Sequence, residues 1–142
     1  MDVRHDSIIV DMVCRAMVPF IQLFALYVLA FGHYSPGGGF QAGAILAGSV
    51  LLTRICLGRG RSYRQFPPNA GPVVAAVGLL IYSGIGLIAM LFGGNYLDYA
   101  KLPIPGFEPP MLRYYGILGI ETGVALGVCG IMVTIFDSLI GE

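Results

Sequence analysis

Four long apolar segments dominate the sequence and constrain its fold more than any other feature. They cover approximately residues 12–31, 40–57, 72–92 and 112–140. A bilayer core of about 30 Å needs roughly 20 apolar residues in helical form, because lipid offers the backbone no hydrogen-bond partners. The composition agrees, since 56% of the 142 residues are hydrophobic and 11% are charged. The sequence therefore predicts an all-α integral membrane protein, with four transmembrane helices in a single membrane domain over residues 1–142.

Arginines in the connection between the second and third segments predict the orientation of the chain. No acidic residue accompanies them; they are Arg54, Arg59, Arg61 and Arg64. The positive-inside rule places such a short basic loop in the cytoplasm. With four spans, both termini are then cytoplasmic, and the connections around residues 32–40 and 95–110 lie outside. We expect a multi-pass protein of the cytoplasmic membrane, embedded in the lipid bilayer.

Charge and residue types exclude several classes of function. Eight basic residues balance eight acidic ones, so no global charge attracts nucleic acid. The three cysteines are far apart and belong to no CxxC pattern, which favours buried thiols over a metal or redox site. The sequence holds neither a Ser–His–acid arrangement nor a pair of neighbouring carboxylates. We therefore expect no metal, no cofactor and no enzymatic activity of the chain by itself.

A glycine-rich stretch, GHYSPGGGF, connects the first and second segments. Pro36 fixes φ, and the glycines that follow it can adopt positive φ, so a tight hairpin at the membrane boundary is predicted. The G-x-G-x-x-A spacing formally matches a dinucleotide fingerprint, but that motif needs a preceding strand and an acidic residue about 20 positions on, and both are missing. The N-terminus of the second helix, at Phe40 and Gln41, could instead offer free amides to a water, an anion or a carboxylate of a neighbouring subunit.

Glu121 lies inside the last apolar segment and is the sharpest candidate for ion chemistry. An ionised carboxylate exposed to lipid costs several kcal/mol, so it must be protonated, paired, or turned toward a hydrated interior or another subunit. The alternative is a shallow Glu121 that reaches the membrane surface near Arg113. His33, at the end of the first segment, is the second candidate for an ion path or for coupling; its alternative is a helix-capping role.

Glycines recur at steps of three or four along the last segment. They are Gly116, Gly119, Gly123, Gly127 and Gly130. Such a stripe lets another helix approach closely, so a helix-packing role is expected. At 100° per residue, Glu121 points away from its stripe neighbours Gly119 and Gly123, and it should face a different element.

Two motifs together resemble a known family. GHYSPGGGFQAG is similar to the G-H-x-x-P-G-G-G-F motif of the MnhB, or MrpB, subunits of multisubunit cation/proton antiporters, and ETGV in the last segment resembles their acid-x-Gly-Val pattern, with Glu121 as the acid. The chain departs from the pattern at Ala42, where many relatives have glycine. The motif positions carried over are His33, Pro36, Gly37, Gly38, Gly39, Phe40 and Gly43.

The resemblance implies a cofactor-free accessory subunit of an Mrp-type sodium/proton antiporter, with large antiporter-like subunits and other small subunits as partners. In that family, translocation is attributed chiefly to the large subunits; the small ones complete the assembly, and a part in the sodium path stays open. Equivalent subunits occur in the Mrp-like modules of membrane-bound hydrogenases and sulfur reductases. The sequence does not separate these settings.

Two other readings are weaker. A homo-oligomeric small transporter would ring a pore with Glu121 and His33, but the third segment offers few polar residues to line a hydrophilic path. A haem-binding anchor would need paired histidines, and the chain has two isolated ones, His5 and His33.

Overall fold

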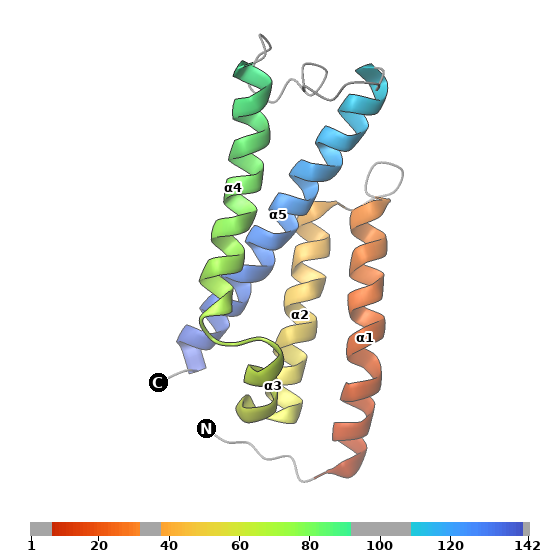
Figure 1. Ribbon diagram of the computed structural model, residues 1–142. Coiled ribbons are helices and arrows are strands. Elements are labelled where there is room, and N and C mark those ends of the chain that lie inside the picture. Colours follow the sequence, from red (N-terminus) through yellow and green to blue (C-terminus); the bar gives the residue numbers. More distant parts are fainter. Residues whose placement is uncertain (1–6, 32–37, 92–108, 141–142) are drawn as a thin grey trace.

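A computed structural model describes residues 7–31, 38–91 and 109–140, and within them the chain is helical apart from short turns (Figure 1). The helices are α1 (Ile8–Ala30), α2 (Gly39–Leu57), α3 (Arg59–Gln65), α4 (Ala70–Leu91) and α5 (Pro109–Ile140). All but α3 are long and apolar enough to cross a membrane. The predicted all-helical fold with four candidate membrane spans is therefore confirmed. The predicted glycine-rich hairpin falls mainly on residues 32–37, outside the described residues, and stays a prediction.

The four long helices lie side by side in the order α1, α2, α5, α4 (Figure 1). Extensive contacts join α1 to α2, α2 to α5, and α5 to α4, whereas α1 touches α5 only slightly. Among the described residues, α1 and α4 are not in contact. At about 1.5 Å per residue, α5 is about 48 Å long and α2 about 28 Å. The α4–α5 pair extends beyond the α1–α2 pair at the top of Figure 1.

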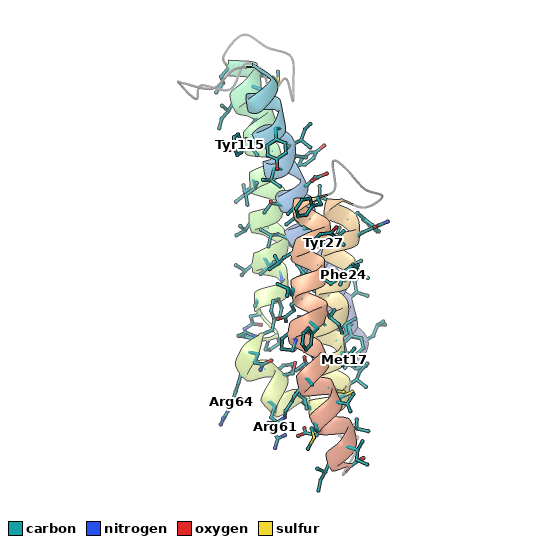
Figure 2. All side chains as sticks on the ribbon, turned by 90° about the vertical axis from the view of Figure 1, so that its right-hand side faces the viewer. Met17, Phe24, Tyr27, Arg61, Arg64 and Tyr115 are labelled. Atoms are coloured by element: carbon teal, nitrogen blue, oxygen red, sulfur yellow. The ribbon has the colours of Figure 1, made fainter. Side chains whose placement is uncertain are left out.

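Small residues form the contacts between the helices. One buried cluster contains Val28, Ala42 and Ala125, and a second contains Ala47, Cys129 and Val133. Large apolar side chains point outward instead, as Figure 2 shows for Met17, Phe24 and Tyr27 of α1. Lipid tails are as apolar as these side chains, so helix association in a membrane depends on close packing of small residues and not on burial of large ones.

The glycine stripe of α5 lies against α4. A Cβ atom added to Gly123 would be 2.9 Å from the carbonyl oxygen of Gly78, and one added to Gly130 would be 2.5 Å from the carbonyl oxygen of Gly71. A Cβ added to Gly119 would be 2.7 Å from the side chain of Ile85. Gly116 is buried, while a Cβ on Gly127 would meet open space. The backbones of α4 and α5 therefore touch over several turns.

Helix α3 lies within the arginine-rich connection, where the sequence predicts only a loop. A single residue, Gly58, with φ of 80°, separates it from α2. Its sequence, RGRSYRQ, has no apolar stripe that would predict a helix. Its stability comes from contacts with α2, described below.

Candidate functional site at the crossing of two helices

The first turn of α2 crosses α5 at Glu121 with no side chain between the two backbones. A Cβ added to Gly39 would be 2.9 Å from the Cα of Glu121 and would overlap the Glu121 carbonyl oxygen. One turn later, a Cβ added to Gly43 would be 2.6 Å from the carbonyl oxygen of Ala125. Both glycines are buried. The crossing distance therefore depends on hydrogen being the side chain at both positions.

Gly38 sets the start of α2 and places it beside the Glu121 carboxylate. It adopts φ of 156° and ψ of −164°, a backbone region that is essentially restricted to glycine. Its carbonyl oxygen accepts the first helical hydrogen bond, from the N–H of Ala42, at 3.0 Å. A Cβ at Gly38 would lie 3.6 Å from Oε1 of Glu121. The carboxylate thus lies at the N-terminal end of a membrane helix.

This position suits a carboxylate for electrostatic reasons. The first-turn N–H groups of a helix have no acceptor within the helix, and the peptide dipoles add up to a partial positive charge at that end. Glu121 is half-buried, and its Oε2 atom is buried. The sequence suggested that the N-terminus of this helix could receive a carboxylate from a neighbouring subunit; the structure shows a carboxylate of the same chain there.

The remaining motif residues divide into exposed and undescribed positions. Phe40 is 66% exposed. His33, Pro36 and Gly37 lie outside the described residues, so their predicted roles stay predictions. The side chain of Arg113, the alternative neighbour of Glu121, is likewise not described.

A buried ion pair joins α2 to α5 near the C-terminal ends of both helices, away from the Glu121 crossing. The Arg54 side chain is fully buried, and that of Asp137 is 12% exposed. Nη2 of Arg54 donates a hydrogen bond to Oδ2 of Asp137 at 2.7 Å, and Nε lies 2.7 Å from Oδ1. This two-point geometry is the strongest arrangement available to an arginine and a carboxylate.

Arg54 also stabilises α3. Its Nη1 donates hydrogen bonds to Oγ of Ser62 at 3.0 Å and to the carbonyl oxygen of Phe66 at 3.2 Å. The rings of Tyr63 and Phe66 lie 4.9 and 5.8 Å from the guanidinium carbon. One buried cation therefore organises α2, α3 and α5 together.

The sequence reasoning missed this ion pair because it counted Arg54 with the arginines of the connection between the second and third segments. A usable signal was present: Asp137 is an acid near the end of an apolar segment, and such a residue needs a partner. Its partner is 83 positions away in the sequence. Spacing along the chain could not identify it.

Polar contacts also link α1 to its neighbours. Nε2 of Gln22 donates a hydrogen bond to Oγ of Ser49 on α2 at 3.3 Å. Asp11 contacts Arg15 in the same helix at 3.0 Å and Arg61 of α3 at 3.1 Å. No group of three metal-ligating side chains occurs among the residues that the structure describes. The described polar chemistry is thus a carboxylate at a helix N-terminus, a buried ion pair and an exposed basic edge.

Comparison with known protein families finds a match over residues 9–134 to a domain described as related to the MnhB subunit of Na⁺/H⁺ antiporter. Individual relatives include the antiporter subunit designated mnhB2 from Staphylococcus aureus strains Newman, JH1 and USA300. Each is 27% identical to this chain over 142 residues, covering 97% of this chain and 97% of the relative.

Proposed function

Because the chain belongs to the family of MnhB-related subunits of Na⁺/H⁺ antiporters, we propose that it is an accessory membrane subunit of an Mrp-type multisubunit sodium/proton antiporter. Its role is to complete the assembly of that complex, with Glu121 contributing to ion coupling or to a subunit contact. Large antiporter-like subunits and other small subunits are its partners.

The observation that carries the proposal is the contact between the glycine motif and α5. Gly39 and Gly43 bring α2 against the Glu121–Ala125 turn, and the shared motif thereby fixes a helix crossing. The same motif leaves the neighbouring Phe40 exposed. A rigid crossing with an exposed aromatic residue beside it is suited to contact with another membrane subunit.

The polar content of the spans supports an accessory role over an independent transporter. Helix α4 contains no charged residue, and the side chains of Arg54 and Asp137 are already paired with each other. Among the described residues, Glu121 is an ionisable group that lies at the α2–α5 crossing. A carboxylate at a helix N-terminus can bind a cation or accept a proton, but a complete path across a membrane needs further polar groups, which other subunits would supply.

The test is purification of the complex through a tag on this chain, followed by sodium-driven proton exchange in proteoliposomes. We expect other membrane subunits to co-purify, and we expect exchange from the complex but none from the chain purified alone. Exchange by the isolated chain at the rate of the complex would contradict the proposal. Co-purification of nickel–iron or iron–sulfur subunits would assign the chain instead to the Mrp-like module of a redox-driven pump.

A further inference from the structure

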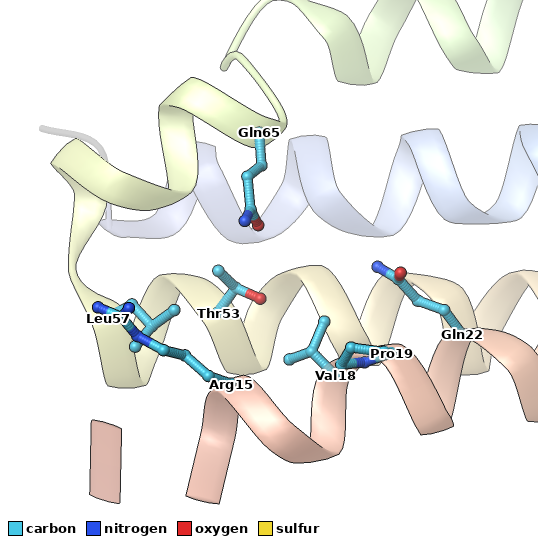
Figure 3. Close-up of a pocket in the computed structure, with 7 residues that line it drawn as sticks. All are labelled: Arg15, Val18, Pro19, Gln22, Thr53, Leu57 and Gln65. Atoms are coloured by element: carbon cyan, nitrogen blue, oxygen red, sulfur yellow. The ribbon is translucent and has the colours of Figure 1, made fainter. Parts of the chain in front are cut away.

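A cavity opens between α1, α2 and the end of α3, at the basic edge of the protein (Figure 3). Its volume is about 420 Å³. Its polar lining comes from Arg15, Gln22, Thr53 and Gln65. Its apolar lining comes from Val18, Pro19 and Leu57. In Figure 3 the side chains of both kinds converge on the space between the three helices.

A second depression, of about 340 Å³, continues from the first toward α3. The two share Arg15, Leu57 and Gln65, and the second adds Arg61 and Arg64. Figure 2 shows the two α3 arginines at this edge of the molecule, beside α1. The combined groove is therefore basic at one end, and its other end is lined by Val18 and Pro19 together with Gln22 and Thr53.

The basic end carries excess positive charge. Asp11 is the acid that contacts Arg15 and Arg61, and the side chains of those two arginines remain 54% and 62% exposed. Arg64 is also exposed and forms no ion pair with any described residue. Among the described residues of this edge, three guanidinium groups lie beside one carboxylate, which gives a net charge of +2.

The end of the groove that contains Val18 and Pro19 runs into the membrane-spanning part of the protein. Val18 and Pro19 lie further along α1 than Arg15, inside a candidate membrane span. Pro19 has no N–H, so it cannot donate the usual helical hydrogen bond to the carbonyl of Arg15.

We propose that this groove binds an anionic phospholipid from the leaflet on the α3 side, such as phosphatidylglycerol. Its phosphate lies between Arg15, Arg61 and Arg64, where forked guanidinium groups match phosphate geometry. A headgroup hydroxyl reaches Gln65, and an acyl chain follows Val18 and Leu57. Basic groups at a membrane surface attract anionic lipids, and this groove adds an apolar wall that free phosphate cannot use.

Native mass spectrometry of the full chain in detergent tests the site. We expect bound phosphatidylglycerol to exceed phosphatidylcholine by at least about fivefold at equal concentration, and the Arg61→Gln/Arg64→Gln variant to bind phosphatidylglycerol about tenfold more weakly. Both arginines are on the surface, so the variant should keep its fold. Arg113→Gln, which removes a cation near the start of α5, should bind like the wild type.

Three outcomes would overturn the lipid assignment. Equal binding of the two lipids would do so, as would unchanged binding by the double variant. Displacement of phosphatidylglycerol by millimolar inorganic phosphate would show that the arginines recognise phosphate without the membrane lipid. A further measurement uses the assembled complex. If the double variant loses another subunit and the wild-type complex retains no phosphatidylglycerol, the groove is a subunit contact and not a lipid site.

Discussion

Glu121 and the Arg54–Asp137 pair show how differently the same membrane environment can use a charged side chain. Glu121 lies at the open end of a helix, beside the glycine motif. Arg54 and Asp137 satisfy each other inside the helix row and also stabilise α3. We therefore propose a coupling role for Glu121 and a structural role for the Arg54–Asp137 pair.

Glu121→Gln removes the carboxylate charge while keeping nearly the same shape and the Gly39 contact with the Glu121 backbone. We expect a severalfold loss of sodium/proton exchange by the complex, with unchanged co-purification of its subunits. Glu121→Asp, which retains the charge, should recover part of the exchange. Loss of assembly in Glu121→Gln would contradict a coupling role and show that the carboxylate is needed structurally.

Arg54→Met leaves Asp137 buried without its cation. Breaking a buried pair in this way costs about 3–5 kcal/mol of folding free energy. Unfolding of the purified chain in increasing sodium dodecyl sulfate, followed by loss of helical circular dichroism, measures the change. Arg61→Met is the matched control, because its contact with Asp11 is exposed and worth at most about 1 kcal/mol. Equal effects of the two variants would argue against a structural role for the buried pair.

Helix packing in this protein is determined by which face of each helix carries small residues. The stripe of α5 that contains Gly123 and Gly130 packs on α4, whereas Glu121 and Ala125 pack on α2. A single helix thus presents two close-contact faces to two neighbours. Gly43 and Gly48 of α2 illustrate the consequence, because an added Cβ would collide with α5 at the first and meet open space at the second.

Gly43→Val should push α2 away from α5, because its Cβ would lie 2.6 Å from the Ala125 carbonyl oxygen. We expect the free energy of unfolding to fall by about 1–3 kcal/mol. We also expect reduced assembly of the complex. Gly48→Val places the same side chain on the same helix at an open position, so its intrinsic effect on the helix is matched. The same detergent unfolding assay compares them. Similar losses in both variants would contradict the packing account of the motif.

In the part of the chain that the structure describes, the four long helices form a row, and its outer helices, α1 and α4, each contact one neighbour extensively. This arrangement leaves broad apolar faces on α1 and α4 for lipid or for other subunits (Figure 2). Two ion pairs bring the start of α1, the helix α3 and the end of α5 to the same end of the helix bundle. They join Arg61 to Asp11 and Arg54 to Asp137. The positive-inside rule predicts that this end is cytoplasmic.

Cysteine labelling in intact cells and in inverted vesicles checks the orientation. Two exposed glutamines allow matched substitutions. Gln41→Cys lies in the first turn of α2, and Gln65→Cys lies on α3, which follows the last turn of α2. In a background lacking Cys14, Cys56 and Cys129, we expect a membrane-impermeant maleimide to label Gln41→Cys from outside and Gln65→Cys only in inverted vesicles. The reverse pattern would contradict cytoplasmic termini.

Hydropathy alone predicted the all-helical fold and its four candidate spans, because the cost of an unpaired backbone in lipid forces any long apolar segment to become a helix. The resemblance of two motifs predicted the family, which the match over residues 9–134 confirms. Neither hydropathy nor the motifs revealed helix α3, because its polar sequence has no helical periodicity. The buried Arg54 donates hydrogen bonds to this helix and to the residue after it.

Contacts between distant segments were beyond the reach of sequence spacing. Two of these contacts join residues more than 80 positions apart: Arg54 pairs with Asp137, and Glu121 lies beside Gly38. Local patterns determine which residues form a helix, because hydrogen bonding within a helix is local. The neighbours of a helix depend instead on how closely whole faces fit, and that fit is decided only when all four helices are packed together.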